Sequence, residues 1–100
     1  MIKSGGENIY PAEVEDVLHS HPLVAEAALI PVPDPTWGEV GRAIVVCKPG
    51  ATLSTDDLRE WLREQMAHYK VPKSFVFRDA LPKTGANKVD KEQLIEVYGS

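Results

Sequence analysis

A lysine-rich segment near the end of the chain is the first candidate for chemistry. Residues 81–91 read LPKTGANKVDK, which places Lys83 and Lys88 on either side of Gly85. A lysine ammonium is a compact charge on a long stem, suited to reaching a phosphate or carboxylate whose negative charge grows during a reaction. We therefore expect a flexible loop that presents lysines to a small anion. Because exposed lysines are common, this loop alone is weak evidence.

The distribution of charge favours a small ligand over a nucleic acid. The chain has a formal net charge of −4, yet residues 70–91 contain six basic and two acidic side chains. Nucleic acid binding would require a broad basic face with aromatic side chains that stack on bases. A short basic segment on an acidic domain instead suits one small anionic ligand, and a solvated charged surface is the plainer alternative.

A glycine pair close to the N-terminus is the second candidate. Residues 2–11 read IKSGGENIYP. Gly5 and Gly6 permit positive φ angles and lack side chains, so that a narrow ligand or another domain can approach the backbone. Their spacing does not match GxGxxG, and no lysine follows them as in a P-loop. From the residues alone, a tight turn leading into a helix is the simpler interpretation.

Several kinds of protein and site are disfavoured. No apolar run approaches the roughly 20 residues that cross a bilayer, and no basic stretch precedes an apolar leader, which predicts a cytoplasmic protein without a membrane span. The single Cys47 cannot form an internal disulfide and follows the apolar run AIVV, which predicts a buried thiol. No metal site is expected, because the three histidines lack nearby ligands at metal-site spacing. They are His19, His21 and His68.

The hydrophobic periodicity predicts a helix, two strands, a helix, a strand and a final helix. Ser54 is suited to cap the second helix, whose apolar residues continue to Tyr69 before Pro72 ends it. Prolines within residues 31–35 predict a loop, because proline cannot donate a hydrogen bond inside a sheet. The other expected elements are a helix from Pro11 to His21, strands over residues 24–32, 42–48 and 75–77, and a helix beginning near Asp90.

This order of elements predicts one small α+β domain of two layers, in which helices pack on a sheet of about three strands. The strands over residues 24–32 and 42–48 are expected to pair with each other. Acidic residues near the start of the first helix are interpreted as surface residues favoured by the helix dipole. They are Glu13, Glu15 and Asp16.

Three motifs follow one another along almost the whole chain. They are KSGGENIYPAEVE over residues 3–15, PDPTWGE over residues 33–39 and LPKTGANK over residues 81–88. Together they resemble the C-terminal domain of the adenylate-forming superfamily, and the GGENI form is similar to its CoA-ligase branch. Asn87 stands where many relatives carry glycine. Asparagine tolerates the left-handed backbone conformation, so we expect the loop to keep its shape.

The resemblance implies an AMP-forming acyl-CoA synthetase, which activates a carboxylic acid with ATP and then transfers it to coenzyme A. Residues 1–100 would form its mobile C-terminal domain, a fragment without the large N-terminal adenylation domain that binds most of the ATP, the Mg²⁺ and the acid. The implied partners are that N-terminal domain, the acyl-adenylate and CoA. The isolated domain is expected to be inactive.

The resemblance also assigns roles in two alternating poses. In one pose Lys88 would contact the carboxylate and the ATP phosphates, and in the other Lys3 would face the adenylate. The pantetheine arm and nucleotide of CoA would lie along Gly5, Gly6, Trp37, Tyr69, Lys70 and Lys73. Core packing is the alternative for Tyr69, and an anchor for the proline loop is the alternative for Trp37.

Two further hypotheses stay open at this stage. The chain begins with Met1 and has enough apolar residues to fold alone, which would suit a free-standing module that binds a nucleotide or a protein. The C-terminal part of a peptide synthetase adenylation domain is the other. The acid is also open, because fatty, aryl and short-chain acids would all bind in the N-terminal domain.

Overall fold

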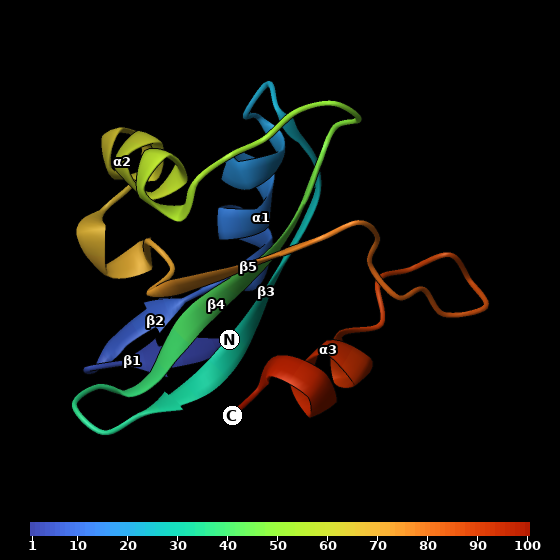
Figure 1. The fold of residues 1–100 in the computed structure, drawn as a ribbon. Helices are drawn as coiled ribbons and strands as arrows, with labels where there is room; N and C mark the ends of the chain where they lie inside the picture. Colours follow the sequence, from blue (N-terminus) through green and yellow to red (C-terminus); the bar gives the residue numbers. More distant parts are fainter.

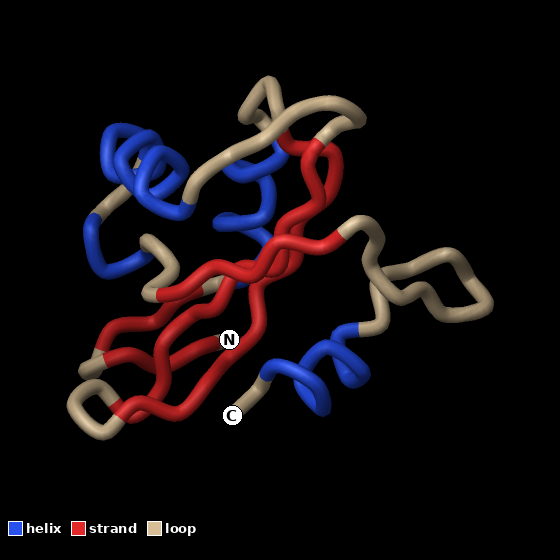
Figure 2. Tube along the Cα trace, viewed as in Figure 1, coloured by secondary structure: helices blue, strands red, loops and turns tan.

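The computed structural model describes residues 1–100 as one five-stranded sheet with helices on both faces (Figures 1 and 2). The strands are β1 (Ile2–Ser4), β2 (Glu7–Ile9), β3 (Val24–Asp34), β4 (Gly38–Cys47) and β5 (Ser74–Arg78). The helices are α1 (Pro11–His19), α2 (Thr55–Gln65), the 3₁₀ helix η1 (His68–Lys70) and α3 (Lys91–Tyr98).

Strand β4 is the centre of the sheet. On one side it pairs antiparallel with β3 over its whole length, as predicted for these two segments. On its other side β1 pairs with the beginning of β4, where Ser4 lies opposite Gly38. Strand β5 runs parallel to the second half of β4, from Arg42 to Val46. Branched residues, which favour the extended backbone, dominate this stretch of β4.

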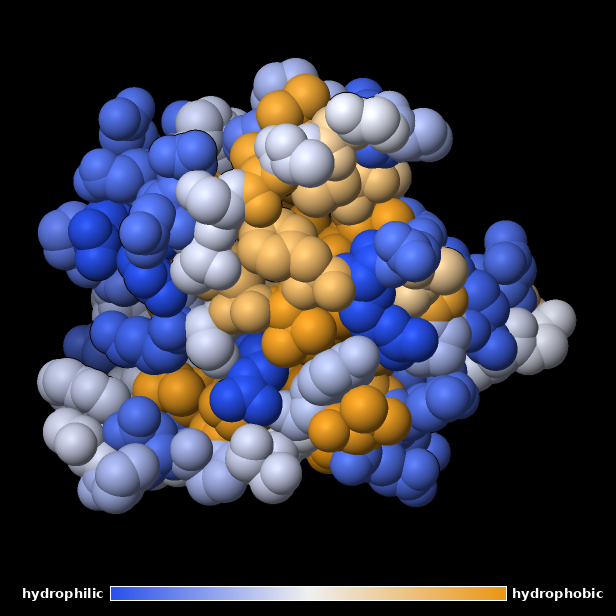
Figure 3. Space-filling view, in the orientation of Figure 1, coloured by the Kyte–Doolittle hydropathy of each residue, from blue (hydrophilic) through white to orange (hydrophobic).

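Alternate residues of β3 and β4 enter two separate hydrophobic cores, as the period of two in a strand requires. The first core joins one face of the sheet to Val14 and Leu18 of α1 and to Leu58 and Leu62 of α2. The second core joins the other face to Leu94 of α3. Figure 3 shows hydrophobic atoms in the middle of one face, where β5 runs in Figure 1, and hydrophilic atoms around α2.

The predicted α+β class is confirmed, but the architecture is richer than two layers with about three strands. Strands β1 and β2 have three residues each, too few to establish an alternating pattern in the sequence. They form a hairpin in which Gly5 and Gly6 have φ angles of 57° and 85°. Helix α3 packs on the face opposite α1 and α2, which adds a third layer.

The prediction of a loop over residues 31–35 was wrong, because β3 continues through Pro31 and Pro33 to Asp34. Both prolines lie opposite β4 residues in the ladder. Strand β3 is the edge of the sheet and pairs only with β4. Proline is tolerated on an edge strand when its nitrogen faces away from the partner strand.

Two side chains of α1 cover the same edge of β3 closer to its beginning. The amide of Ala27 donates to Nε2 of His19 at 3.1 Å, and the amide of Leu29 donates to the carboxylate of Glu15 at 2.8 Å. The two prolines follow at the next alternate positions and have no N–H group. This edge therefore offers no free donor to another strand over residues 27–33, which protects it from intermolecular pairing.

The second helix ends earlier than predicted. Ser54 caps α2 as expected and accepts a hydrogen bond from the amide of Asp57 at 3.0 Å. The helix stops at Gln65, because Met66 takes an extended conformation with φ −152° and ψ 167°. The break moves Tyr69 into η1 and away from the buried face of α2, where helical spacing had suggested it. Cys47, expected to be buried, is only half-buried at the end of β4.

None of the helices combines the length and the hydropathy that a membrane crossing requires.

The first prediction concerns His21, which lies edge-on to Trp61 with ring centroids 4.7 Å apart and accepts from the amide of Leu23 at 3.0 Å. Burial lowers the pKa of His21 below its ordinary value near 6.5. The unfolded chain therefore binds more protons, and the free energy of unfolding decreases as the pH falls below about 6.5. The substitution His21→Asn should flatten the slope of Tm against pH between pH 7 and 5.

The exposed His68 provides the control for this experiment. His68→Asn should leave the pH slope of the wild-type chain unchanged. If His21→Asn keeps the wild-type slope of Tm against pH, another group causes the pH dependence.

Candidate functional site

Two turns meet at one end of the sheet and form the base of a pocket. The amide of Gly5, in the β1–β2 turn, donates to the carbonyl of Trp37, in the β3–β4 turn, at 2.9 Å. A Cβ atom on Gly5 would lie 2.4 Å from Cε3 of Trp37, and the φ angle of Gly5 is 57°. Both the contact with the indole and the backbone conformation therefore require glycine at this position.

Asp34 sets the position of Trp37. Its carboxylate accepts from the amide of Thr36 at 2.8 Å and from that of Trp37 at 2.9 Å. Aspartate favours such turns because its short side chain can bond the backbone two or three residues ahead. Gly38 then has a φ angle of 86° and begins β4. Trp37 stays 48% exposed, and the Lys73 ammonium lies over its ring, 6.0 Å from the centroid.

A pocket of about 280 Å³ opens beside this indole. Four of the residues expected to bind CoA gather here, although they come from separate parts of the sequence. The lining residues are Ser4, Gly5, Glu7, Trp37, His68, Tyr69 and Lys73. Tyr69 is 37% exposed and belongs to no core cluster, which rules out the core-packing alternative for it. We call this cavity the tryptophan pocket.

A second cavity of about 410 Å³ adjoins the tryptophan pocket and shares His68 and Lys73 with it. Its other lining residues are Arg59, Arg63, Val71 and Pro72. No acidic side chain lines this cavity, which we call the basic pocket. Cationic side chains without a lining carboxylate are suited to a phosphate group.

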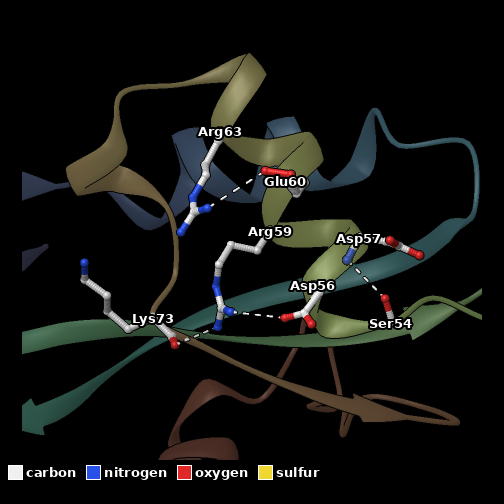
Figure 4. A network of polar contacts seen from close by, with 7 residues as sticks. All are labelled: Ser54, Asp56, Asp57, Arg59, Glu60, Arg63 and Lys73. Carbon is white, nitrogen blue, oxygen red and sulfur yellow. Dashed lines mark hydrogen bonds and ion pairs between the residues drawn. The ribbon is translucent and has the colours of Figure 1, made fainter.

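Figure 4 shows how α2 holds the two arginines of the basic pocket. Arg59 pairs with Asp56 at 3.6 Å and donates to the carbonyl of Lys73 at 3.1 Å, so that it joins α2 to the chain before β5. Arg63 lies 4.0 Å from the exposed Glu60. Sequence reasoning missed both arginines, although their spacing of four residues on a helix places them on one face.

Four of the expected site residues line neither pocket: Lys3, Gly6, Lys70 and Lys88. The Lys70 ammonium pairs with Glu13 of α1 at 2.5 Å, and this hydrogen bond is the main reason why the pKa of Lys70 is raised. Lys3 is exposed on β1, and its amide donates to the carboxylate of Glu39 at 3.3 Å. Gly6 has open space around its Cβ position.

Lys88 belongs to the loop between β5 and α3, which projects beyond β5 on the opposite side of the domain from the β1–β2 and β3–β4 turns (Figure 1). The loop is an ordered hairpin. The amide of Asn87 donates to Thr84, and the amide of Thr84 donates to the carbonyl of Lys88, at 2.9 and 2.8 Å. Asn87 has a φ angle of 61°, the only positive one outside glycine. Asn87 therefore adopts the left-handed conformation that was expected to be tolerated here.

The lysines of residues 70–91 differ in whether they have an acidic partner. Three of the five are paired with glutamates from α1 and β3: Lys70 with Glu13, Lys83 with Glu26 and Lys91 with Glu15. The interpretation of Glu13 and Glu15 as mere surface residues was therefore incomplete. Lys73 and Lys88 have no ion pair, and each remains available to an external anion.

The largest cavity, of about 430 Å³, lies at the far end of β4 and is lined by ten residues from 47–53 and 77–79. It contains none of the expected site residues. No three His, Cys, Asp or Glu side chains approach one another closely enough to hold a metal ion.

Comparison with known proteins identifies the family. The family model described as AMP-binding enzyme C-terminal domain matches residues 13–88, which is most of the chain. The chain belongs to this family. The match includes the whole basic pocket and the hairpin up to Lys88, whereas Ser4, Gly5 and Glu7 of the tryptophan pocket precede it.

Relatives of this AMP-binding C-terminal domain are CoA-ligating enzymes. Feruloyl-CoA synthase from Amycolatopsis sp is 54% identical over 99 residues, which cover 99% of this chain and 20% of that protein. A fatty acyl CoA synthetase from Mycobacterium tuberculosis superposes with a TM-score of 0.91 at 42% identity, covering 99% of this chain and 20% of that one.

The o-succinylbenzoate CoA synthetase from Bacillus subtilis, solved with its acyl-adenylate intermediate, superposes with a TM-score of 0.87 at 46% identity. The superposition covers 93% of this chain and 19% of that enzyme. The chain thus spans about a fifth of the length of its relatives.

The second prediction separates two requirements for glycine at position 5, the left-handed backbone and the close contact with the Trp37 ring. In Gly5→Ala the added methyl group must displace the Trp37 ring, and the left-handed backbone also becomes strained. We expect a loss of about 2–3 kcal/mol in the free energy of unfolding. In a Trp61→Phe background, Trp37 fluorescence should shift to the red.

Gly6→Ala is the matched control, because Gly6 also has a positive φ angle but nothing lies within 4 Å of its Cβ position. It should lose only about 1 kcal/mol and leave the emission maximum in place. Equal emission spectra for the two variants would contradict the close packing of Gly5 against the indole.

Proposed function

We propose that this chain is the mobile C-terminal domain of an AMP-forming acyl-CoA ligase. In this role Lys88 serves acyl-adenylate formation, and the tryptophan pocket serves transfer to CoA. The observation that carries the proposal is that the loop bearing Lys88 and the two turns at the base of the tryptophan pocket lie on opposite sides of the domain. A rotation of the domain can then present first one and then the other to a single active site in the N-terminal domain.

The adenylation role of Lys88 is supported by its exposure and its lack of an acidic partner. In acyl-adenylate formation the carboxylate oxygen attacks the α-phosphorus of ATP, and negative charge moves towards the leaving pyrophosphate. A fixed ammonium beside these oxygens stabilises that charge and aligns the two substrates. Lys88 transfers no proton in this scheme and acts through its position and its charge.

The thioester step is assigned to the opposite edge of the domain. There Lys3 faces the adenylate, and the backbone of Gly5 and Gly6 borders the channel for the pantetheine arm. Trp37 forms a wall of this channel. The absence of side chains on both glycines leaves room for a narrow chain that ends in a thiol.

The nucleotide of CoA fits the two adjoining pockets. Tyr69 and Trp37 offer exposed aromatic faces on which the adenine can stack. Lys73, between the pockets, and Arg63, in the basic pocket, are suited to the 3′-phosphate. Arg59, also on α2, adds positive charge to the basic pocket. Lys70 is left out of this contact, because Glu13 holds its ammonium.

The remaining parts of the reaction belong to the N-terminal domain of the proposed ligase. ATP, Mg²⁺ and the carboxylic acid would bind mainly there. The chain has no carboxylate cluster for Mg²⁺, so we assign it no step that involves the metal. The choice among aryl, fatty and short-chain acids is likewise assigned to that domain, whose pocket would enclose the acyl group.

The third prediction tests Lys88 in the complete ligase. Lys88→Ala should slow acyl-adenylate formation, measured as pyrophosphate release, about a hundredfold, because one charge-stabilising contact is lost in the transition state. Thioester formation from supplied acyl-adenylate should keep most of its rate.

Lys48→Ala removes another exposed lysine without an acidic partner and should leave both half-reactions unchanged. An equal loss of both half-reactions in Lys88→Ala would reject the division of labour between the two sides of the domain.

The fourth prediction tests the basic pocket with CoA and dephospho-CoA, which lacks the 3′-phosphate. The variants Lys73→Gln and Arg63→Gln should each raise the KM for CoA about tenfold, because a charged hydrogen bond is lost. For dephospho-CoA the same variants should behave like the wild type.

Lys70→Gln is the control for this measurement, since Glu13 already occupies its ammonium. It should leave the KM for CoA unchanged. A similar increase of KM for both cofactor forms would place the 3′-phosphate elsewhere.

A further inference from the structure

Two ion pairs hold the base of the Lys88 hairpin against the rest of the domain. Lys83, before the turn, pairs with Glu26 of β3. Lys91, after the turn, pairs with Glu15 of α1 at 2.6 Å. The two glutamates belong to different elements, and neither is adjacent in sequence to the hairpin. The hairpin is thus fixed at both of its ends by tertiary contacts.

We propose that Glu26 and Glu15 are positioning residues for Lys88. They fix the direction in which the hairpin leaves the domain, and they neutralise the two lysines closest to its tip. This inference rests on the proposed function of Lys88 in adenylation, because it concerns how that lysine reaches its substrates.

The backbone of the hairpin alone does not set its direction. Within it, Lys83 and Val89 form a single isolated bridge, and the amide of Asp90 donates to the carbonyl of Pro82 at 2.8 Å. These bonds define the shape of the turn. No strand pairs with the hairpin on either side, and an isolated two-stranded ribbon is only marginally stable in water. The Lys83–Glu26 pair connects it directly to the sheet.

Glu15 provides the firmer of the two attachments. Its carboxylate accepts from the amide of Leu29 at 2.8 Å and from Lys91 at 2.6 Å, and its side chain is 17% exposed. A carboxylate fixed by a backbone amide loses little further freedom when it pairs with a lysine. Lys91 is also the first residue of α3, directly after the N-cap Asp90, so this pair attaches the junction of hairpin and helix to α1.

Charge neutralisation is the second consequence of these pairs. Without glutamate partners, Lys83 and Lys91 would compete with Lys88 for the same anion. Their positive charges would also repel the ammonium of Lys88. With both paired, Lys88 is the one lysine of the hairpin whose charge is not compensated. A substrate phosphate or carboxylate then meets a single cation in a defined place, which favours one productive geometry.

The fifth prediction concerns Glu26→Gln in the complete ligase. The exposed Lys83–Glu26 pair contributes up to about fivefold to the population of the oriented hairpin. We therefore expect kcat for acyl-adenylate formation to decrease about fivefold, while the rate of thioester formation from supplied adenylate stays unchanged. Hydrogen exchange of the peptide spanning residues 81–90 should accelerate by a similar factor.

Three further variants separate positioning from general destabilisation. Glu15→Gln keeps an oxygen for the Leu29 amide but loses the charge that pairs with Lys91, and should also slow adenylation selectively. The exchanged pair, Glu26→Lys with Lys83→Glu, should restore adenylation to within about twofold of wild type. Glu96→Gln removes an exposed, unpaired glutamate from α3 and should change neither half-reaction.

The outcomes distinguish this inference from the proposed function. If Lys88→Ala leaves adenylation intact, the proposed function fails and the positioning role fails with it. If Lys88→Ala loses about a hundredfold but Glu26→Gln and Glu15→Gln behave like Glu96→Gln, only the positioning role is overturned. Failure of the exchanged pair to restore the rate would likewise overturn it.

Discussion

The pairing of β4 on both of its sides is the interaction on which the rest of the structure depends. At its beginning β4 pairs with β1, which brings Gly5 against Trp37. Along its second half it pairs with β5 in parallel, so that the chain leaves β5 near the opposite end of β4. The tryptophan pocket and the Lys88 hairpin are therefore separated by the length of one strand.

The lysines of residues 70–91 fall into two groups, those that pair with a glutamate and those that do not. The paired lysines of residues 70–91 attach η1, the hairpin and α3 to α1 and β3, and so they contribute to the architecture. Lys73 and Lys88, which lack acidic partners, lie on the two opposite sides where the proposed reaction needs a cation. The net charge of −4 thus conceals a division of these lysines into those with an acidic partner and those without one, which only the tertiary structure reveals.

Glu15 both protects the edge of β3 and positions the Lys88 hairpin in the mechanism proposed above. His19 and Glu15 accept from its outward amides, and two prolines remove the next donors, so the edge offers no free N–H group over residues 27–33. Glu15 also accepts from Lys91, and it therefore links this protected edge to the position of the Lys88 hairpin. The protection of an exposed strand and the orientation of the proposed adenylation lysine share one carboxylate.

The sequence by itself determined the longer elements, the pairing of β3 with β4, the cap at Ser54 and the tolerance of Asn87 for a left-handed backbone, because periodicity and local backbone preference decide these features. It did not determine β1 and β2, the continuation of β3 through its prolines or the end of α2. Strands of three residues carry no periodicity, and a proline is acceptable only where its nitrogen faces outward. The tertiary structure alone decided which lysines are paired and that Arg59 and Arg63 join Lys73, since these contacts join segments far apart in the chain.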